Sequence, residues 1–239
     1  MSSKIGINLI RNYSINFDLP KRNKKLIKFI ILHYTGMKKE KDAIKKLKNY
    51  RSKVSSHYFI KNNGDVLLMV PDLYSAWHAG KSKWKQYRSL NKYSIGIEIN
   101  NPGHDNGYKK YSSKQINSIS KLIKFLMKKY KVKKQNILGH SDVAPDRKKD
   151  PGEKFPWNKL AKKKLCNWPN IENKELNKYR NLKLQKLDEK IFFKNLYNIG
   201  YPKSKSINLI KSFQRKYRQN LVNGIIDQEC FLLSKILLK

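Results

Sequence analysis

The chain has 239 residues and a formal net charge of +37, from 54 lysines and arginines against 17 acidic residues. This length accommodates one domain of ordinary size together with a small second one. No run of about eighteen apolar residues occurs, which excludes an ordinary membrane-spanning helix. The residues after Met1 do not lead into the apolar core of an export signal. We therefore expect a cytoplasmic protein, with the periplasm or cell envelope as the alternative.

The positive charge admits two interpretations. One is a polyanionic partner, either nucleic acid or a carboxylate-rich cell-wall polymer. The other is a biased composition, which the residues favour, because only 8 of the 54 basic residues are arginine and lysines occur in every segment. Proteins that read nucleic acid usually use arginine for bidentate contacts. The sequence therefore predicts no nucleic-acid partner, although the charge can still attract an anionic substrate.

The first half of the chain predicts strands around one helix. Residues 26–32 form an apolar run rich in isoleucine, typical of a strand buried on both faces. His33 follows at the carboxyl end of this run, where sites form in open sheets. Residues 41–50 have helical spacing. Residues 56–70 have the pattern of two strands joined by a turn at 62–65, which indicates a hairpin.

The second half of the predicted domain continues this alternation. Residues 94–100 have the pattern of a strand that contains Glu98. Residues 112–115 have the sequence of a capping box, and apolar residues at helical spacing follow it. Residues 136–138 form a last short strand that leads into His140. We predict an α/β fold, with a central mixed β-sheet flanked by helices and a small C-terminal three-helix domain.

Composition divides the chain into three parts. We predict a catalytic domain over 1–169, a polar linker over 170–187 and a helical domain over 188–239, which is too small to be stable without packing against the first. The two cysteines, Cys166 and Cys230, lie in apolar surroundings near predicted helices. We expect them to be unpaired, and neither is a candidate metal ligand or nucleophile.

The segment from Gly139 to Gly152 carries the strongest functional signal. It places His140 and Asp150 ten positions apart, among turn-forming and basic residues. With His33, these side chains provide two imidazoles and one carboxylate, which leave one position open on a tetrahedral zinc ion. Glu98 interrupts an alternating isoleucine pattern and is available as an acid/base group; the alternative is a solvent-facing strand carboxylate. These residues are the parts of a metal-assisted amide hydrolase.

The remaining histidines and one further carboxylate have weaker signals. His57 lies within a strand pattern and is predicted to be packed, or to support a ligand from behind. His78, in an Ala-Trp-His-Ala-Gly motif, is predicted to line a groove. His104 lies in a loop rich in glycine and asparagine and is predicted to be solvated. Asp142 is the carboxylate that would act as base if Glu98 does not.

Five motifs occur here in the order seen in a known enzyme family: His33–Thr35, Ser55–Tyr58, Ala76–Gly80, Ser94–Glu98 and Gly139–Gly152. The chain resembles the zinc-dependent N-acetylmuramoyl-L-alanine amidases of the amidase-2 class, which share their fold with peptidoglycan recognition proteins. The segments Ile199–Tyr201, Ser212–Arg215 and Asn223–Gly224 resemble the C-terminal helical peptidoglycan-binding module of one bacterial subgroup.

This resemblance implies a role for each candidate residue. His33, His140 and Asp150 would bind one zinc ion per chain, Glu98 would be the catalytic carboxylate, and Lys148 would stabilise the oxyanion. The implied reaction is hydrolysis of the amide bond between N-acetylmuramic acid, including its 1,6-anhydro form, and L-alanine in peptidoglycan or muropeptides, by a monomer. A non-catalytic peptidoglycan-binding protein is the alternative, but receptors of that kind typically lack a zinc ligand, and none is missing here.

Overall fold

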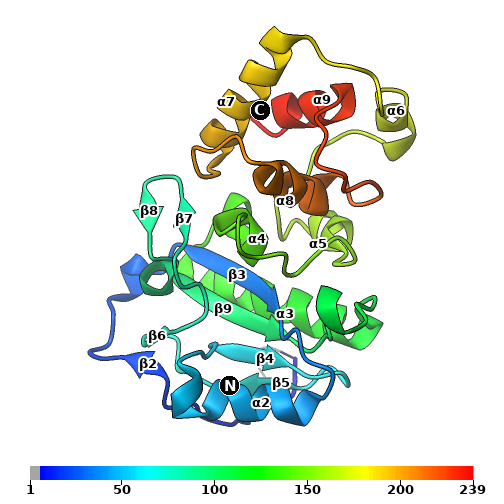
Figure 1. Cartoon of the computed structure of the whole chain (residues 1–239). Helices are drawn as coiled ribbons and strands as arrows, with labels where there is room; N and C mark the ends of the chain where they lie inside the picture. Colours follow the sequence, from blue (N-terminus) through cyan, green and yellow to red (C-terminus); the bar gives the residue numbers. More distant parts are fainter. Residues whose placement is uncertain (1–5, 239) are drawn as a thin grey trace.

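The computed structural model describes residues 6–238 and has a mixed β-sheet at its centre (Figure 1). The strands of this sheet are β1 (Leu9–Arg11), β3 (Phe29–Tyr34), β4 (Tyr58–Ile60), β5 (Val66–Leu68), β9 (Ser94–Ile99) and β10 (Ile137–Gly139). They are ordered β1-β5-β4-β9-β3-β10, and β4 and β5 form the antiparallel pair while the other neighbours are parallel. Residues 1–5, on which part of the expectation about export depends, lie outside the described residues.

Helices and small ribbons surround the sheet. The helices are α2 (Glu40–Lys48), α3 (Ser113–Tyr130), α4 (His140–Val143), α5 (Trp157–Lys162), α6 (Asn173–Asn177), α7 (Lys186–Ile199), α8 (Ile207–Tyr217) and α9 (Gln228–Ile236). Two short ribbons pair β2 (Phe17–Asp18) with β6 (Ser75–Ala76), and β7 (Lys83–Trp84) with β8 (Tyr87–Arg88). Short 3-10 helices occur at Lys24–Leu26, Tyr50–Ser52, Leu90–Tyr93, His104–Asn106 and Lys134–Asn136. The predicted mixed sheet flanked by helices is confirmed.

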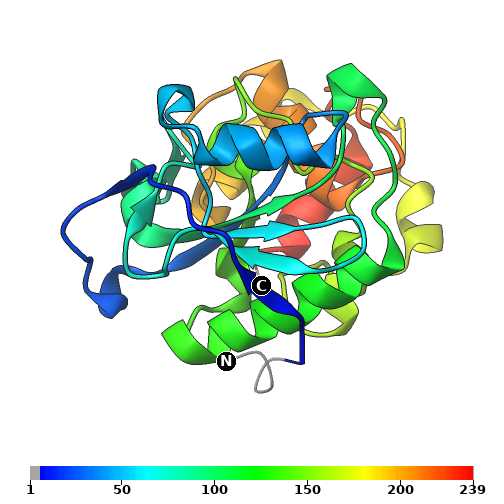
Figure 2. The ribbon, with the colours of Figure 1, turned by 90° about the horizontal axis from the view of Figure 1, so that it is seen from below.

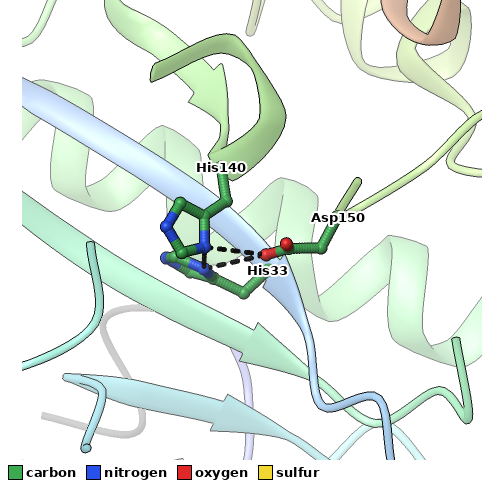
Figure 3. Close-up of side chains that lie close together, drawn as sticks. All are labelled: His33, His140 and Asp150. Carbon is green, nitrogen blue, oxygen red and sulfur yellow. Dashed lines mark hydrogen bonds and ion pairs between the residues drawn. The ribbon is translucent and has the colours of Figure 1, made fainter. Parts of the chain in front are cut away.

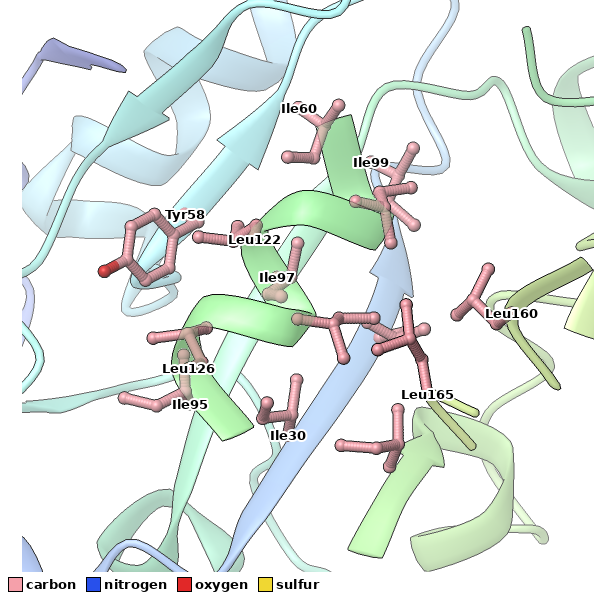
Figure 4. Packing of buried hydrophobic residues seen from close by; sticks show 14 of the residues in the cluster. Ile30, Tyr58, Ile60, Ile95, Ile97, Ile99, Leu122, Leu126, Leu160 and Leu165 are labelled. Atoms are coloured by element: carbon pink, nitrogen blue, oxygen red, sulfur yellow. The ribbon is translucent and has the colours of Figure 1, made fainter. Parts of the chain in front are cut away.

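Helix α3 covers one face of the sheet. It begins with the predicted capping box, because Ser112 Oγ accepts from the Gln115 backbone N–H and Gln115 Oε1 accepts from the Ser112 N–H. Its apolar residues, Leu122 and Leu126 among them, pack against isoleucines that point from β3 and β9 towards the helix (Figure 4). Each leucine buried in this way contributes about 1.5–3 kcal/mol to folding. Helix α2 lies on the opposite side of the sheet (Figure 2).

Strand β3 is buried on both faces, as predicted, because its side chains alternate between two apolar clusters. Ile30 and Leu32 join the cluster under α3, whereas Phe29 and Ile31 join a second cluster. The second cluster also contains Phe192 and Phe213 from the C-terminal helices. These helices therefore pack directly against the sheet that carries the candidate site.

The predicted bounds of β3 were wrong by three residues at its start. The apolar run begins at Leu26, but Lys24–Leu26 form a 3-10 helix capped by Asn23. The strand begins only at Phe29, opposite Ser94, where its neighbour β9 also begins, and it continues through His33 to Tyr34. His33 is consequently the fifth residue of a buried strand, and its ring is held in a fixed place beside the sheet.

Two expectations about the whole chain can be checked within residues 6–238. No helix in this range is both long enough and apolar enough to cross a membrane. Cys166 and Cys230 are buried free thiols, so no disulfide joins them, as expected. Burial raises the pKa of each thiol to about 12, which keeps both protonated and unreactive at neutral pH.

Candidate metal centre and active site

Three predicted ligand residues meet at one point beside the sheet (Figure 3). His33 Nδ1 lies 2.9 Å from His140 Nδ1 and 3.0 Å from Asp150 Oδ2, and His140 Nδ1 lies 3.1 Å from the same oxygen. All three residues are buried. Ligand atoms on a tetrahedral zinc ion lie roughly 3.3 Å apart, given metal–ligand distances of about 2.0–2.1 Å. The cluster thus has the spacing and the donor types of a three-ligand metal site.

The topology of the sheet explains why residues so far apart in sequence meet. His33 lies near the carboxyl end of β3, and His140 directly follows β10, which runs parallel to β3. Parallel neighbours end at the same edge of a sheet, so the two rings come together there. The loop then returns Asp150 to the cluster, and the Ser141 backbone N–H donates to the Asp150 carbonyl at 2.9 Å. Gly139 allows this close return, because a Cβ there would lie 2.8 Å from Pro151 Cδ.

The protonation states of the cluster suit a metal ligand set. Burial and the neighbouring His140 lower the pKa of His33 to about 4, so its imidazole is neutral at pH 7. Burial alone would raise the pKa of Asp150. The electrostatic interaction with His140 and the contacts of both histidines with Oδ2 outweigh burial and hold that pKa below its ordinary value. A neutral imidazole and an ionised carboxylate are the forms that bind a metal ion.

Each histidine has a partner for its second ring nitrogen. His140 Nε2 lies 3.1 Å from the carbonyl oxygen of Ala79, which can only accept, so Nε2 carries the proton and Nδ1 presents its lone pair. His33 Nε2 lies 3.0 Å from His78 Nδ1. Partners of this kind fix the tautomer and the ring orientation of metal-ligating histidines.

His78 extends this contact into the interior. Its Nε2 lies 3.1 Å from Ser94 Oγ, and the Ser94 hydroxyl donates to the Leu90 carbonyl at 2.6 Å. Because that carbonyl can only accept, donation runs in one direction, from His33 to His78 to Ser94. Burial and the neighbouring His33 lower the pKa of His78 well below its ordinary value, which keeps it neutral as this chain of donors requires. Gly96 leaves room for the ring, since a Cβ there would lie 2.4 Å from His78 Cγ.

Glu98 lies beside the cluster on β9, directly opposite His33 on β3. Its Oε2 atom is buried and has no hydrogen-bond partner among residues 6–238. Burial, and next the charge of Asp150, raise the pKa of Glu98 well above its ordinary value. A half-buried carboxylate that lines the cavity, with an unused oxygen and a raised pKa, has the properties of a general base.

A cavity of about 470 Å³ opens over the cluster, a size typical of small-molecule sites. His33, His140, Asp150, Glu98 and Lys148 all line it, so the structure brings every predicted site residue to one cavity. Its other charged lining residues are Lys46, Asp105, Arg147 and Lys149. Trp77 also lines the cavity, and its indole N–H donates to Asp18 at 2.7 Å.

The other polar residues differ from the predictions in part. His57 is fully packed, as predicted. His78 lines the cavity, as predicted, but the sequence did not predict the contact between His78 and His33. The prediction that His104 is solvated was wrong, because its ring bridges Tyr34 Oη at 2.9 Å and Glu153 Oε2 at 3.0 Å. Asp142 is not among the residues that line the cavity, and both of its carboxylate oxygens accept hydrogen bonds from other protein groups. It is therefore excluded as the base.

Residues 22–153, more than half of the chain, match the family described as N-acetylmuramoyl-L-alanine amidase. The chain belongs to this family. All the predicted site residues lie within the matched segment, and the amidase is therefore an amide hydrolase.

Two relatives show how far the similarity extends. N-acetylmuramoyl-L-alanine amidase AmiD from Escherichia coli (strain K12) is 31% identical over 232 residues, which cover 89% of this chain and 83% of AmiD. The structure of AmiD from E. coli with anhydro-N-acetylmuramic acid-L-Ala-D-gamma-Glu-L-Lys is similar with a TM-score of 0.77 and 29% identity, covering 92% of this chain and 91% of that one. The 1,6-anhydro-N-acetylmuramyl-L-alanine amidase AmpD from E. coli (strain K12) is 37% identical over 105 residues, which cover 44% of this chain and 55% of AmpD. The similarity to AmiD thus extends beyond residues 22–153 of this amidase.

Proposed function

We propose that this amidase cleaves the bond between N-acetylmuramic acid and L-alanine, with one zinc ion per chain bound by His33, His140 and Asp150. The observation that carries the proposal is the convergence of two Nδ1 atoms and one carboxylate oxygen beside Glu98, whose Oε2 has no other partner among residues 6–238. A non-catalytic peptidoglycan-binding protein would not need this buried, unpartnered carboxylate oxygen, which makes folding less favourable.

The roles of the side chains follow from their chemistry. A zinc ion held by His33, His140 and Asp150 would lower the pKa of a water molecule and polarise the amide carbonyl. Glu98 accepts a proton from the attacking water, whose oxygen forms a bond to the carbonyl carbon. Lys148 offers its ammonium group to the negative charge that develops on the carbonyl oxygen. As the C–N bond breaks, Glu98 passes the proton to the nitrogen of L-alanine, leaving a lactyl carboxyl group and a free amine.

The charges around the cavity indicate the substrate class. Outside the candidate site, three cations (Lys46, Arg147 and Lys149) and one acidic residue (Asp105) line the cavity. The structure of AmiD contains a substrate with a gamma-linked glutamate, which carries a free carboxylate. We propose that the stem peptide of a muropeptide enters this cavity and that its carboxylates are bound by these cations.

A competition assay tests the reaction and the substrate form together. The purified amidase is given anhydro-muropeptides and muropeptides with an intact reducing end at equal concentration, and the products are identified by mass spectrometry. The proposal expects free stem peptide from at least one form, released about 10²-fold or more slowly by the Glu98→Gln variant at the same zinc occupancy. The ratio of the two products shows which form is preferred. Intact substrates after exhaustive digestion would refute the proposed reaction.

The oligomeric state and the cellular compartment are two further proposals. We expect a monomer, which light scattering of the purified protein tests. We also propose that the protein acts in the cytoplasm, with the periplasm or cell envelope as the alternative. Immunoblotting of fractionated cells distinguishes these compartments.

A further inference from the structure

The loop that carries the candidate ligands is held from the far side by the C-terminal helices. Asp142 lies two residues after His140 in the single turn of α4, and its side chain is fully buried. Lys216 on α8 donates to Asp142 Oδ2 at 2.8 Å, and the Tyr201 hydroxyl donates to Asp142 Oδ1 at 2.9 Å. The carboxylate therefore joins a ligand-bearing turn to two residues that follow it by about sixty positions or more.

Asp142 also shapes the turn from within. Its Oδ2 accepts the Gly139 backbone N–H at 2.8 Å, which fixes the start of the turn from which His140 projects. Lys216 in addition donates to the carbonyl of Ile137 on β10 at 3.1 Å. One ammonium group thus contacts both the strand that precedes His140 and the carboxylate that follows it.

Lys216 also contacts the aromatic rings of Trp157 and Tyr217. Its side chain is 3% exposed, and its Nζ lies 4.5 Å from the centre of the Trp157 ring. A lysine buried in this way costs free energy unless it is paired, so its place beside Asp142 needs a structural reason. Burial alone would lower its pKa, but Asp142 outweighs burial and keeps the ammonium charged.

Two residues that flank α8 contact the loop at two later points. Ser206 Oγ donates to Asp146 Oδ1 at 2.7 Å, before Lys148 and Asp150. Gln219 Nε2 donates to the carbonyls of Glu153 and Phe155, both at 2.6 Å, just after Asp150. Contacts from residues 201–219 therefore bracket the whole segment that carries His140, Lys148 and Asp150. In Figure 1, α8 lies between the remaining C-terminal helices and α4.

We propose that Lys216 and Tyr201 are positioning residues for the metal centre, and that they act through Asp142 to hold residues 139–150 in the ligand-binding conformation. The identity of the bound metal rests on the proposed function. The contacts of Lys216 and Tyr201 with Asp142, which we call the clamp, do not depend on it. The C-terminal helices would then complete the active site of this amidase, in addition to any contact they make with the cell wall.

The test compares two buried ion pairs of the C-terminal helices in the full-length protein. K216M removes the charge that reaches Asp142 and keeps a side chain of similar length. R218M is the matched control, because Arg218 is equally buried but pairs with Asp227, away from the loop. Y201F removes only the hydroxyl donor to Asp142 and is the milder variant if K216M does not fold.

Two measurements separate positioning from general stability. The first is the zinc dissociation constant, measured by competition with a chelator below the melting temperature. We expect K216M to weaken zinc binding about 10–100-fold and Y201F to weaken it less, with R218M unchanged within about threefold. The second is hydrogen exchange of the Ser141 amide in the metal-free protein, since this N–H donates to Asp150. We expect faster exchange in K216M and Y201F, and wild-type exchange in R218M.

The opposite pattern would overturn the proposal. If K216M and Y201F lower the melting temperature as R218M does, but keep wild-type zinc affinity and Ser141 exchange, the helices only stabilise the fold. A wild-type protein that binds no zinc would refute the proposed metal centre, and the exchange measurement would still decide about the clamp.

Discussion

Replacing Glu98 by glutamine should make this amidase more stable and nearly inactive at the same time. The variant keeps the shape of the side chain but removes its charge and its basicity. In the wild type, the Oε2 atom is buried and unpartnered among the described residues, and the pKa of the carboxyl is raised by burial. The folded state therefore binds the Glu98 proton more tightly than the unfolded state does.

The direction of the stability change depends on pH. A carboxyl with a raised pKa in the folded state contributes its full stability below the unfolded value of about 4.3, and loses it as pH rises through the folded value. Desolvation of an unsatisfied buried group costs about 1–3 kcal/mol, and less for a neutral amide than for a carboxylate. We expect E98Q to gain about 1 kcal/mol near pH 7.5, which raises the melting temperature by about 2–4 °C in a chain of this length.

Calorimetry of the zinc-free protein at pH 7.5 and near pH 4 measures this effect. The gain in melting temperature should disappear at the lower pH, where Glu98 is protonated in both states. E229Q is the matched control, because Glu229 is buried but bound by Arg180 at 2.7 Å, so its neutralisation should lower the melting temperature. The kcat of E98Q should fall about 10²-fold or more with zinc retained. A destabilised E98Q with nearly normal kcat would refute this account of Glu98.

Three further predictions concern the cavity and its supports. K148M should lower kcat by about 10²–10³-fold at unchanged zinc content, whereas K149M in the same cavity should change kcat little; equal losses would contradict a specific role for Lys148. H78N keeps a hydrogen-bond acceptor near His33 Nε2 and should retain zinc affinity. H78Q keeps instead a side chain long enough to contact Ser94, and its zinc affinity, measured by chelator competition, should fall about 10–100-fold. Equal zinc affinities of the two variants would argue against the His33 contact. The KM for an anionic muropeptide should rise with salt in steady-state assays, and a KM independent of salt would argue against binding by cavity cations.

Local sequence patterns were sufficient to predict β3, β4, β5, β9 and β10 and to select the three clustered residues, but they did not predict β1. His33 and His140 each follow an apolar strand pattern, and parallel strands bring their carboxyl ends to one edge. The capping box at Ser112 was also predicted, because its residues lie within a few positions of each other. The start of β3 was misplaced, because it depends on where the neighbouring β9 begins.

The contacts behind the cluster could not be predicted in this way. His78 meets His33 across 45 positions, and Lys216 meets Asp142 across 74. The polar loop around His104 predicts a solvated ring, but the partners of that ring, Tyr34 and Glu153, come from distant segments. Only the packing of the sheet against its loops and the C-terminal helices creates these neighbours, and no local spacing encodes them.

Zinc titration of the metal-free amidase tests the central claim most directly. Release of stem peptide from an anhydro-muropeptide is followed by mass spectrometry as zinc is added in fractions of one equivalent. The account predicts that activity rises linearly, stops at one zinc per chain, and is absent in the His33→Ala variant at the same zinc concentration. Full activity in the metal-free protein, or wild-type activity in the variant, would contradict it.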